Sequence, residues 1–168
     1  MAYTLEQLST DCHAAMAEDS GKAGREKVRD FIAKACADAD FVAEHFENPG
    51  QGERHVLYQD PDFDFCILAH SYNGAKGSNP HDHGPSWAIY GQAVGETMMT
   101  DWECIEKPAD GNPGKVKKVR DYSLKPGDAY VYHEGDLHSP SREDDTRLIR
   151  VEGQDLAGVK RDRYEVAA

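Results

Sequence analysis

Three histidines have the side-chain type and the spacing of a metal site. His81 and His83 are one residue apart, after a stretch rich in Gly, Ser and Asn. In a strand, residues i and i+2 point to the same face, about 7 Å apart at the backbone. Both side chains can therefore converge on one ion while Asp82 points away. The other interpretation is that they are two polar residues at an exposed strand end. A third ligand elsewhere in the chain would favour the metal site.

The best candidate for a third ligand is His138. It lies in LKPGDAYVYHEGDLHSP, where Pro126-Gly127-Asp128 predicts a turn, a short strand follows and Gly135 leads to the histidine. Three neutral imidazoles suit Fe, Ni, Cu or Zn, and the ligand type alone does not choose among them. Without a carboxylate ligand a bound cation keeps its full charge, which favours anionic ligands such as a thiolate or an enolate. Three protein ligands also leave about three positions of an octahedral ion open for a bidentate substrate and O₂.

The composition predicts one ordinary globular domain. The 168 residues are 39% hydrophobic and 30% charged, which suits a single core. The net charge of −12 and the scattered Lys and Arg argue against a nucleic-acid partner. No run approaches the roughly 20 apolar residues that span a bilayer. The start, MAYTLEQLSTD, has no features of a secretory signal, so we expect a cytoplasmic protein with no membrane partner.

The cysteines predict free, mostly buried thiols rather than disulfides or a zinc knuckle. They are widely spaced and never form Cys-x-x-Cys, and a reducing compartment keeps such thiols reduced. We expect packing roles for all four: Cys12, Cys36, Cys66 and Cys104.

The first 48 residues have a helical pattern. Thr4 with Gln7 predicts a capping box ahead of an apolar stripe. Turn signals then separate three helices: Ser20-Gly21 ends the first, the second begins near Lys22, and Asn48-Pro49-Gly50 ends a third over about 39–47.

After Pro49 the pattern changes to short strands separated by turns. The predicted strands are His55–Tyr58, Phe63–His70, Ser86–Gly91, Glu96–Cys104, Val116–Tyr122, Ala129–Tyr132 and Thr146–Val151. Seven or eight short strands at such spacing predict a β-sandwich or barrel. We expect a single, mainly β domain over 1–168, with a barrel core over 50–155 and the N-terminal helices of 1–48 packed outside it.

The two histidine segments resemble the two motifs of the cupin superfamily, a small double-stranded β-helix or jelly roll. HDH followed by Gly95 resembles the first motif, and PGD…G…H resembles the second, with His138 at its ligand position. Where the first motif usually has a glutamate, this chain has Trp87 or Ala88. The resemblance therefore implies a cupin jelly roll with a three-histidine ligand set: His81, His83 and His138.

A narrower resemblance, to the cysteine dioxygenase family of thiol dioxygenases, runs from HDH to GETMMTDW. The upstream order is similar too, with a strand that carries Arg54, the strand FDFCILAH and a Gly-rich loop, so the resemblance covers roughly residues 50–151. It implies one Fe(II) on three histidines and the oxidation of a small thiol to a sulfinate with O₂. It also implies an arginine that binds the substrate carboxylate, for which Arg54 is the nearest counterpart, with His55 or Tyr58 as the neighbours that face the pocket if the register shifts.

The chain departs from that family in two places. Ala88 stands where animal members have a cysteine that forms a thioether cross-link, and Leu148, Arg150 and Glu152 replace a Ser-His-Tyr trio on the late strand. These changes argue against cysteine itself as the substrate. Arg150 offers an alternative anchor for an acidic substrate, with Glu152 balancing its charge. The other interpretation of this pair is a surface salt bridge on an edge strand.

Aromatic residues follow HDH and precede His138. Strand alternation directs Tyr130 and Tyr132 to one face and Val131 and His133 to the other. We expect such tyrosines to be core residues, although one hydroxyl near a metal would serve O₂ chemistry.

Three hypotheses for the function follow. The first is an Fe(II) dioxygenase for a small, carboxylate-bearing thiol, with Ni, Zn or Cu as alternative metals in the purified protein and with homodimer formation left open. The second keeps the iron but cleaves a carbon–carbon bond of a β-diketone or hydroxy-ketone, which would need an apolar pocket without an arginine. The third is a non-catalytic metal-binding cupin, which we would expect to block the open metal positions with protein side chains.

Overall fold

The computed structural model of the protein describes residues 2–47 and 52–168, so the helix stop predicted at Asn48-Pro49-Gly50 lies outside the described residues. Three helices precede ten strands in these residues. In chain order the elements are α1 (Leu5–Glu18), α2 (Lys22–Ala37), α3 (Ala39–Phe46), β1 (Arg54–Gln59), β2 (Cys66–Tyr72), β3 (Lys76–Gly77), β4 (Ala88–Val94), β5 (Thr97–Glu106), β6 (Gly114–Leu124), β7 (Ala129–Tyr132), β8 (Leu137–Arg142), β9 (Thr146–Glu152) and β10 (Tyr164–Val166).

Short polar side chains start two of the helices. The Thr4 hydroxyl accepts a hydrogen bond from the Gln7 backbone N–H at 3.1 Å, as a helix N-cap does. The Gln7 side chain donates to Asp11 at 2.9 Å instead of reaching back, so half of the predicted capping box forms. Asp38 caps α3 in the same way by accepting from the Phe41 N–H at 3.0 Å.

None of the helices in the described residues is long and apolar enough to cross a membrane.

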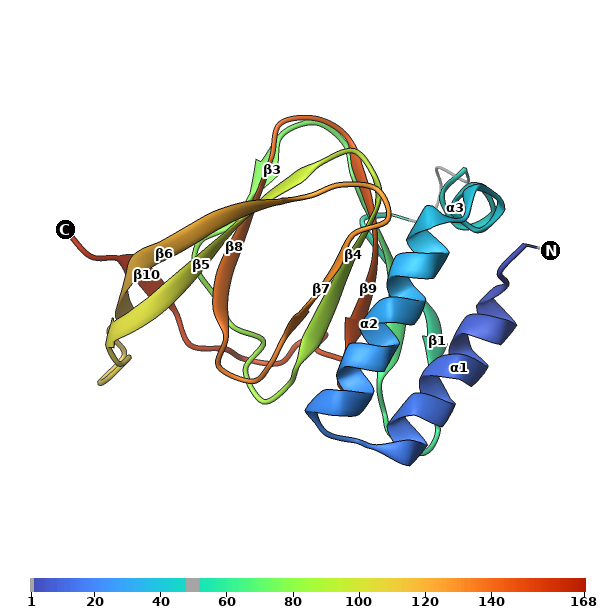
Figure 1. Cartoon of the computed structure of the whole chain (residues 1–168). Helices are drawn as coiled ribbons and strands as arrows, with labels where there is room; N and C mark the ends of the chain where they lie inside the picture. Colours follow the sequence, from blue (N-terminus) through green and yellow to red (C-terminus); the bar gives the residue numbers. More distant parts are fainter. Residues whose placement is uncertain (1, 48–51) are drawn as a thin grey trace.

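The strands form two curled five-stranded sheets that face each other, with the helices outside one of them (Figure 1). The first sheet has the order β1-β2-β9-β4-β7 and the second β10-β6-β5-β8-β3. Neighbouring strands are mostly far apart in sequence, as in a jelly roll, and β9 is the central strand of the first sheet. The mainly β jelly roll with helices packed outside, expected from the sequence, is confirmed.

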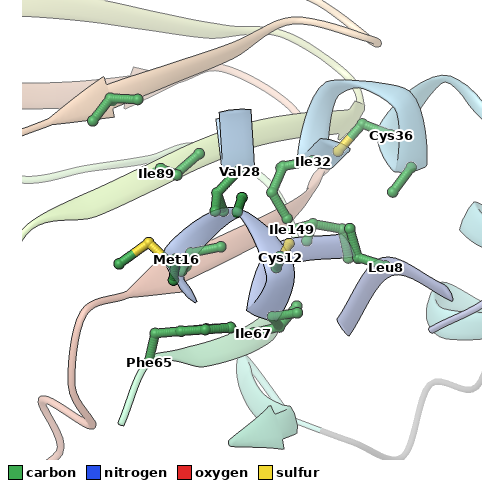
Figure 2. Packing of buried hydrophobic residues seen from close by; sticks show 14 of the residues in the cluster. Leu8, Cys12, Met16, Val28, Ile32, Cys36, Phe65, Ile67, Ile89 and Ile149 are labelled. Carbon is green, nitrogen blue, oxygen red and sulfur yellow. The ribbon is translucent and has the colours of Figure 1, made fainter. Parts of the chain in front are cut away.

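The helices cover the outer face of the first sheet with an apolar layer (Figure 2). Ile89 on β4 and Ile149 on β9 are fully buried there against Ile32 of α2 and its neighbours. Gly91 permits this approach, because a Cβ at that position would lie 2.4 Å from Cγ2 of Ile32. The close contact between α2 and β4 therefore depends on a residue without a side chain.

A second, smaller cluster fills the space between the two sheets. It contains Ala88, Tyr90, Met99, Leu124 and Tyr132, with Tyr122 and Tyr130 packed against it. Tyr130 and Tyr132 therefore share the interior face while Val131 belongs to the helix-covered layer, as alternation predicted.

Two predicted strand limits are wrong. The strand predicted from Phe63 begins at Cys66, because the Asp60 carboxylate accepts the backbone N–H groups of Asp62 and Phe63 at 2.9 and 2.8 Å and holds a turn there. The strand predicted from Ser86 begins at Ala88, because the Ser86 hydroxyl and N–H bond locally.

Three strands were not expected from the sequence. β8 contains Pro140 and few typical strand residues, and it forms because β5 pairs along its length. β3 has two residues, and β10 pairs in parallel with the start of β6. Through β10 the second sheet extends beyond residue 155, where we expected the barrel to end.

The cysteines are all free, as predicted, but they do not all pack in the core. Cys12, Cys36 and Cys66 are buried, and burial raises the pKa of the Cys36 thiol to about 12 and that of Cys66 to about 11. Cys104 is exposed, so its predicted packing role is wrong. It lies on the part of β5 that extends past the interior cluster.

Candidate metal centre

The backbone holds His81 and His138 directly opposite each other. The His81 N–H donates to the His138 carbonyl at 3.0 Å, and the His138 N–H donates to the His81 carbonyl at 2.9 Å, in an isolated antiparallel bridge. His83 follows two residues later, just before a turn at Gly84, whose φ is +60°. The His-x-His segment is therefore a single bridge rather than the regular strand we expected, but it still aims both rings inward.

Three imidazole rings converge at this point. Their ligand atoms all lie within 4.8 Å of one another, and Nε2 of His83 is 3.1 Å from Nε2 of His138. Nδ1 of His81 lies 2.9 Å from the Asn79 carbonyl, and Nδ1 of His138 lies 2.9 Å from the Asp136 carbonyl. Because a carbonyl only accepts, both Nδ1 atoms carry the proton and both Nε2 atoms present a lone pair.

The three rings are uncharged at neutral pH. Burial lowers the pKa of His81 to about 4, and it lowers the pKa values of His83 and His138 well below their usual range. Nδ1 of His83 is buried and has no hydrogen-bond partner among the described residues. Neutral, desolvated imidazoles with free lone pairs are the form in which histidine binds a metal ion.

The geometry fits a shared ion. Two nitrogens each about 2.1 Å from one ion, on bonds at roughly 90–110°, lie about 3 Å apart. The observed separation of 3.1 Å between Nε2 of His83 and Nε2 of His138 agrees with this. The predicted ligands His81, His83 and His138 are thus brought together into a group that could hold a metal ion, and the ligand type does not fix which metal.

Tyr90 closes one side of the histidine group. Its hydroxyl lies 3.1, 3.4 and 3.5 Å from Nε2 of His83, His138 and His81, respectively. The tyrosine is fully buried, and burial raises the pKa of its phenol above the usual value. The Tyr90 side chain is therefore a neutral phenol that donates a hydrogen bond. The Tyr132 ring stacks on the His138 ring, with 3.8 Å between the ring centroids, and so helps to hold that histidine in position.

A cavity of about 530 Å³ lies beside the histidines. His81, His83 and Tyr90 are among the residues that line it. Its lining contains two acidic residues, Asp162 and Glu165, and five basic ones: Lys76, Arg142, Arg150, Arg161 and Arg163. The centre therefore faces an electropositive space that suits small anionic ligands.

Arg150 lies on the wall of this cavity. Across the β4–β9 pair it is directly opposite Tyr90, and its guanidinium carbon lies 4.2 Å from the centre of the tyrosine ring. It forms no ion pair among the described residues, and β9 is the central strand of its sheet. The interpretation of Arg150 and Glu152 as a surface salt bridge on an edge strand is therefore wrong.

Arg54 and Tyr58 lie outside the lining of the cavity. The Arg54 guanidinium donates to Glu152 at 2.9 Å and to Asp155 at 2.7 Å, so two carboxylates already neutralise it. Glu152 thus pairs with Arg54, not with Arg150 as we expected. The Tyr58 hydroxyl donates to Asp60 at 3.0 Å, and its ring packs on the helix-covered layer.

Sequence reasoning missed Arg142, Arg161 and Arg163. Arg142 had a usable signal, because it follows His138 at i+4 on a strand and so shares its face. Arg161 and Arg163 had none, since they lie in a polar segment between two strands.

No protein-family model and no curated protein matches this chain. Solved structures with a similar fold include a cupin-2 domain protein from Shewanella frigidimarina, with a TM-score of 0.47 and 13% identity over 66% of this chain and 89% of that one. A cupin superfamily protein from Desulfitobacterium hafniense has a TM-score of 0.44 and 14% identity over 64% and 82% of the two chains. KdgF from a Halomonas species has a TM-score of 0.43 and 19% identity over 59% and 76%. Each of these is a similarity of fold at low sequence identity.

Proposed function

We propose that the protein is a mononuclear Fe(II) dioxygenase that oxidises a small, carboxylate-bearing thiol to a sulfinate. The observation that carries the proposal is the convergence of three neutral histidines, two of which, His81 and His83, line a cavity that Arg150 also lines. His81, His83 and His138 would hold the ion. When bound, iron supplies a site where the thiolate and O₂ meet, and both oxygen atoms of O₂ end on the sulfur.

In this proposal Arg150 binds and orients the carboxylate. A guanidinium pairs with a carboxylate through two parallel N–H···O bonds, which fixes both the distance and the direction of the ligand. The Arg150 side chain is held against the Tyr90 ring, and its Nε is buried without a partner in the described part of the chain. A carboxylate would therefore gain a hydrogen-bond donor that is already desolvated.

In this proposal Tyr90 holds a proton beside the reacting atoms. Its hydroxyl lies within 3.5 Å of all three Nε2 atoms. It can donate a hydrogen bond to an anionic group bound next to the histidines, and the raised pKa keeps the proton on the phenol oxygen. Tyr90, His83 and His138 are all buried, so these three side chains have little contact with bulk water.

The two other hypotheses are less well supported. A β-diketone needs an apolar pocket, whereas this cavity presents several arginines, which favour an acidic substrate. One observation favours a non-catalytic cupin: the Tyr90 hydroxyl lies against the same three lone pairs that a metal would use. Turnover assays separate these cases.

The test is metal analysis of protein purified without added metal, followed by O₂-uptake assays with four compounds. We expect iron and O₂ uptake with 3-mercaptopropionate or mercaptosuccinate, weak uptake with cysteine and none with a β-diketone. Mass spectrometry should find a product two oxygen atoms heavier than the thiol. Absence of iron, together with no uptake on any compound after Fe(II) reconstitution, would overturn the proposal.

A further inference from the structure

Arg142 is a second buried arginine in the cavity wall. Arg142 is only 5% exposed to solvent. Its Nε donates to the Thr97 hydroxyl at 3.1 Å, and its guanidinium carbon lies 4.6 Å from the centre of the Tyr72 ring. One terminal nitrogen is buried and has no hydrogen-bond partner within the described ranges. A buried, unpaired cation is unfavourable unless an anion joins it, so this guanidinium points to a ligand.

Arg142 and Arg150 each present a guanidinium group to the cavity. Arg142 ends β8 in one sheet and Arg150 lies on β9 in the other, so they reach the cavity from opposite sheets. Arg150 lies over the Tyr90 ring, next to the histidines, whereas Arg142 lies over the Tyr72 ring. Each guanidinium leaves a buried nitrogen without a partner in the described residues.

The C-terminal segment adds two more arginines to the same wall. β10 pairs in parallel with β6, which brings Arg161 and Arg163 to the cavity. Within the described residues they donate only to backbone carbonyls, Arg161 to Asp82 at 3.1 Å and Arg163 to Gly111 at 3.2 Å. Neither arginine pairs with a carboxylate within the described residues, and both line the cavity.

The four arginines of the cavity wall lack carboxylate partners within the described residues although the chain is rich in carboxylates. The chain has 31 Asp and Glu against 19 Lys and Arg. Of the five arginines outside the cavity wall, four are paired with carboxylates: Arg25, Arg29, Arg54 and Arg120. The fifth, Arg147, donates to two backbone carbonyls and the Asn73 amide oxygen. The lysine on the wall, Lys76, is paired with Glu53, and the wall residue Glu165 is paired with Lys115. Asp162 is the other acidic residue in the lining. The four cavity arginines are thus left for a ligand.

We propose that the cavity binds a small thiol with two carboxylate groups, the second of which is held by Arg142 with support from Arg161 and Arg163. The inference rests on the proposed function for the thiol, and Arg150 holds the first carboxylate. A single carboxylate satisfies one guanidinium fork, so two buried guanidinium groups over different rings match two carboxylates. Arg142 and the C-terminal arginines would thus determine specificity for a dicarboxylate over a monocarboxylate.

The test compares thiol-free acids by isothermal titration calorimetry under argon, on the full chain with its measured metal content. Propionate offers one carboxylate and succinate two, and neither offers a sulfur to the metal. We expect succinate to bind at least about tenfold more tightly than propionate, because a second charge-assisted pair forms. Arg142→Met should reduce this preference to about twofold or less while leaving propionate binding unchanged. Arg29→Met, at a half-buried position of α2 outside the cavity lining, is the matched control and should change neither affinity.

A second variant covers a failure of Arg142→Met to fold. Arg161→Gln combined with Arg163→Gln alters two exposed side chains, and it should weaken succinate binding about threefold with less effect on propionate. Equal binding of succinate and propionate by the wild-type protein would overturn the inference. Two other results would also overturn it: inorganic phosphate binding as tightly as succinate, or Arg142→Met weakening both acids equally, since each indicates one shared anion position.

O₂ uptake separates this inference from the proposed function. Succinate selectivity that depends on Arg142, without O₂ uptake on mercaptosuccinate or 3-mercaptopropionate, would leave the two anion positions standing and reject the dioxygenase. Equal turnover of the two thiols, without any binding preference for succinate, would support the dioxygenase and reject the second carboxylate position.

Discussion

The two faces of the sheet β1-β2-β9-β4-β7 differ completely in character although they come from the same strands. On the outer face Ile89 of β4 lies opposite Val151 of β9, and both are buried under the helices. One residue along, on the inner face, Tyr90 lies opposite Arg150 beside the histidine group. Strand alternation alone separates the two environments.

The comparison shows that stability and chemistry are assigned to different faces. The outer face is held by apolar burial, which has no direction and tolerates changes of shape within limits. The inner face holds polar groups out of water at fixed positions, which is unfavourable for each group alone and makes the space ready for a charged ligand. Substitutions on the two faces should therefore have different consequences.

The largest change in stability should come from the outer face. Ile149→Ala removes a fully buried side chain from the layer between β9 and the helices, and it should lower the free energy of unfolding by about 2–5 kcal/mol. Chemical denaturation measures this, with Val119→Ala at an exposed position as the control. The metal content of folded protein should stay unchanged. Loss of metal would show that the two faces are energetically coupled.

The largest change on the inner face should come from a ligand. His138→Ala removes one of three converging Nε2 atoms and should reduce the metal affinity by at least about a hundredfold, more than the loss of a supporting residue does. Metal analysis after dialysis measures it. His133→Ala is the matched control, because that ring lies near Arg25 on the helix side. An unchanged metal content in His138→Ala would exclude His138 as the third ligand.

Arg150→Met should affect the substrate more than the protein. We expect KM for a thiol acid to rise about tenfold, equivalent to about 1.4 kcal/mol, with a smaller change in kcat, since the carboxylate pair forms before the reaction. Arg54→Met tests the alternative anchor and should leave KM within about twofold, because Arg54 is already paired with Glu152 and Asp155. A reversal of these two results would place the carboxylate at Arg54.

The smallest effect concerns a polar pair at the rim of the helix-covered face. His13 on α1 hydrogen bonds to the buried Asp60 carboxylate at 2.8 Å, which raises the pKa of His13 above its usual 6.5. A raised pKa in the folded state contributes stability that is present below the unfolded pKa and is lost as the pH rises through the folded pKa.

The Tm of the wild-type protein should therefore be higher than that of His13→Gln, and this difference in Tm should be larger at about pH 5.5 than at about pH 8.5. Thermal melts of both proteins across this range measure the difference. A difference in Tm that does not change with pH would mean that His13 stabilises the protein without its charge.

Much of the fold follows from local pattern. Seven of the ten strands and all three helices lie close to their predicted positions, because alternation, apolar spacing and capping residues are properties of short segments. β8 was missed because Pro140 reads as a turn residue, and its strand geometry comes from pairing with β5. The start of β2 was misplaced because the Asp60 side chain bonds to the backbone that follows it.

The sequence alone determined the three-histidine group, since side-chain type and spacing identified His81, His83 and His138 before any distance was known. It also determined which residues share a strand face, because the period of a strand is two. Only the tertiary structure decided which arginine faces the cavity. Arg54 and Arg150 both carry a guanidinium group that can bind a carboxylate. Arg54 is already paired with Glu152 and Asp155, whereas Arg150, on the central strand β9, lies against the Tyr90 ring. The contribution of Arg142 and the C-terminal segment likewise depends on pairing between strands far apart in sequence, which no local pattern records.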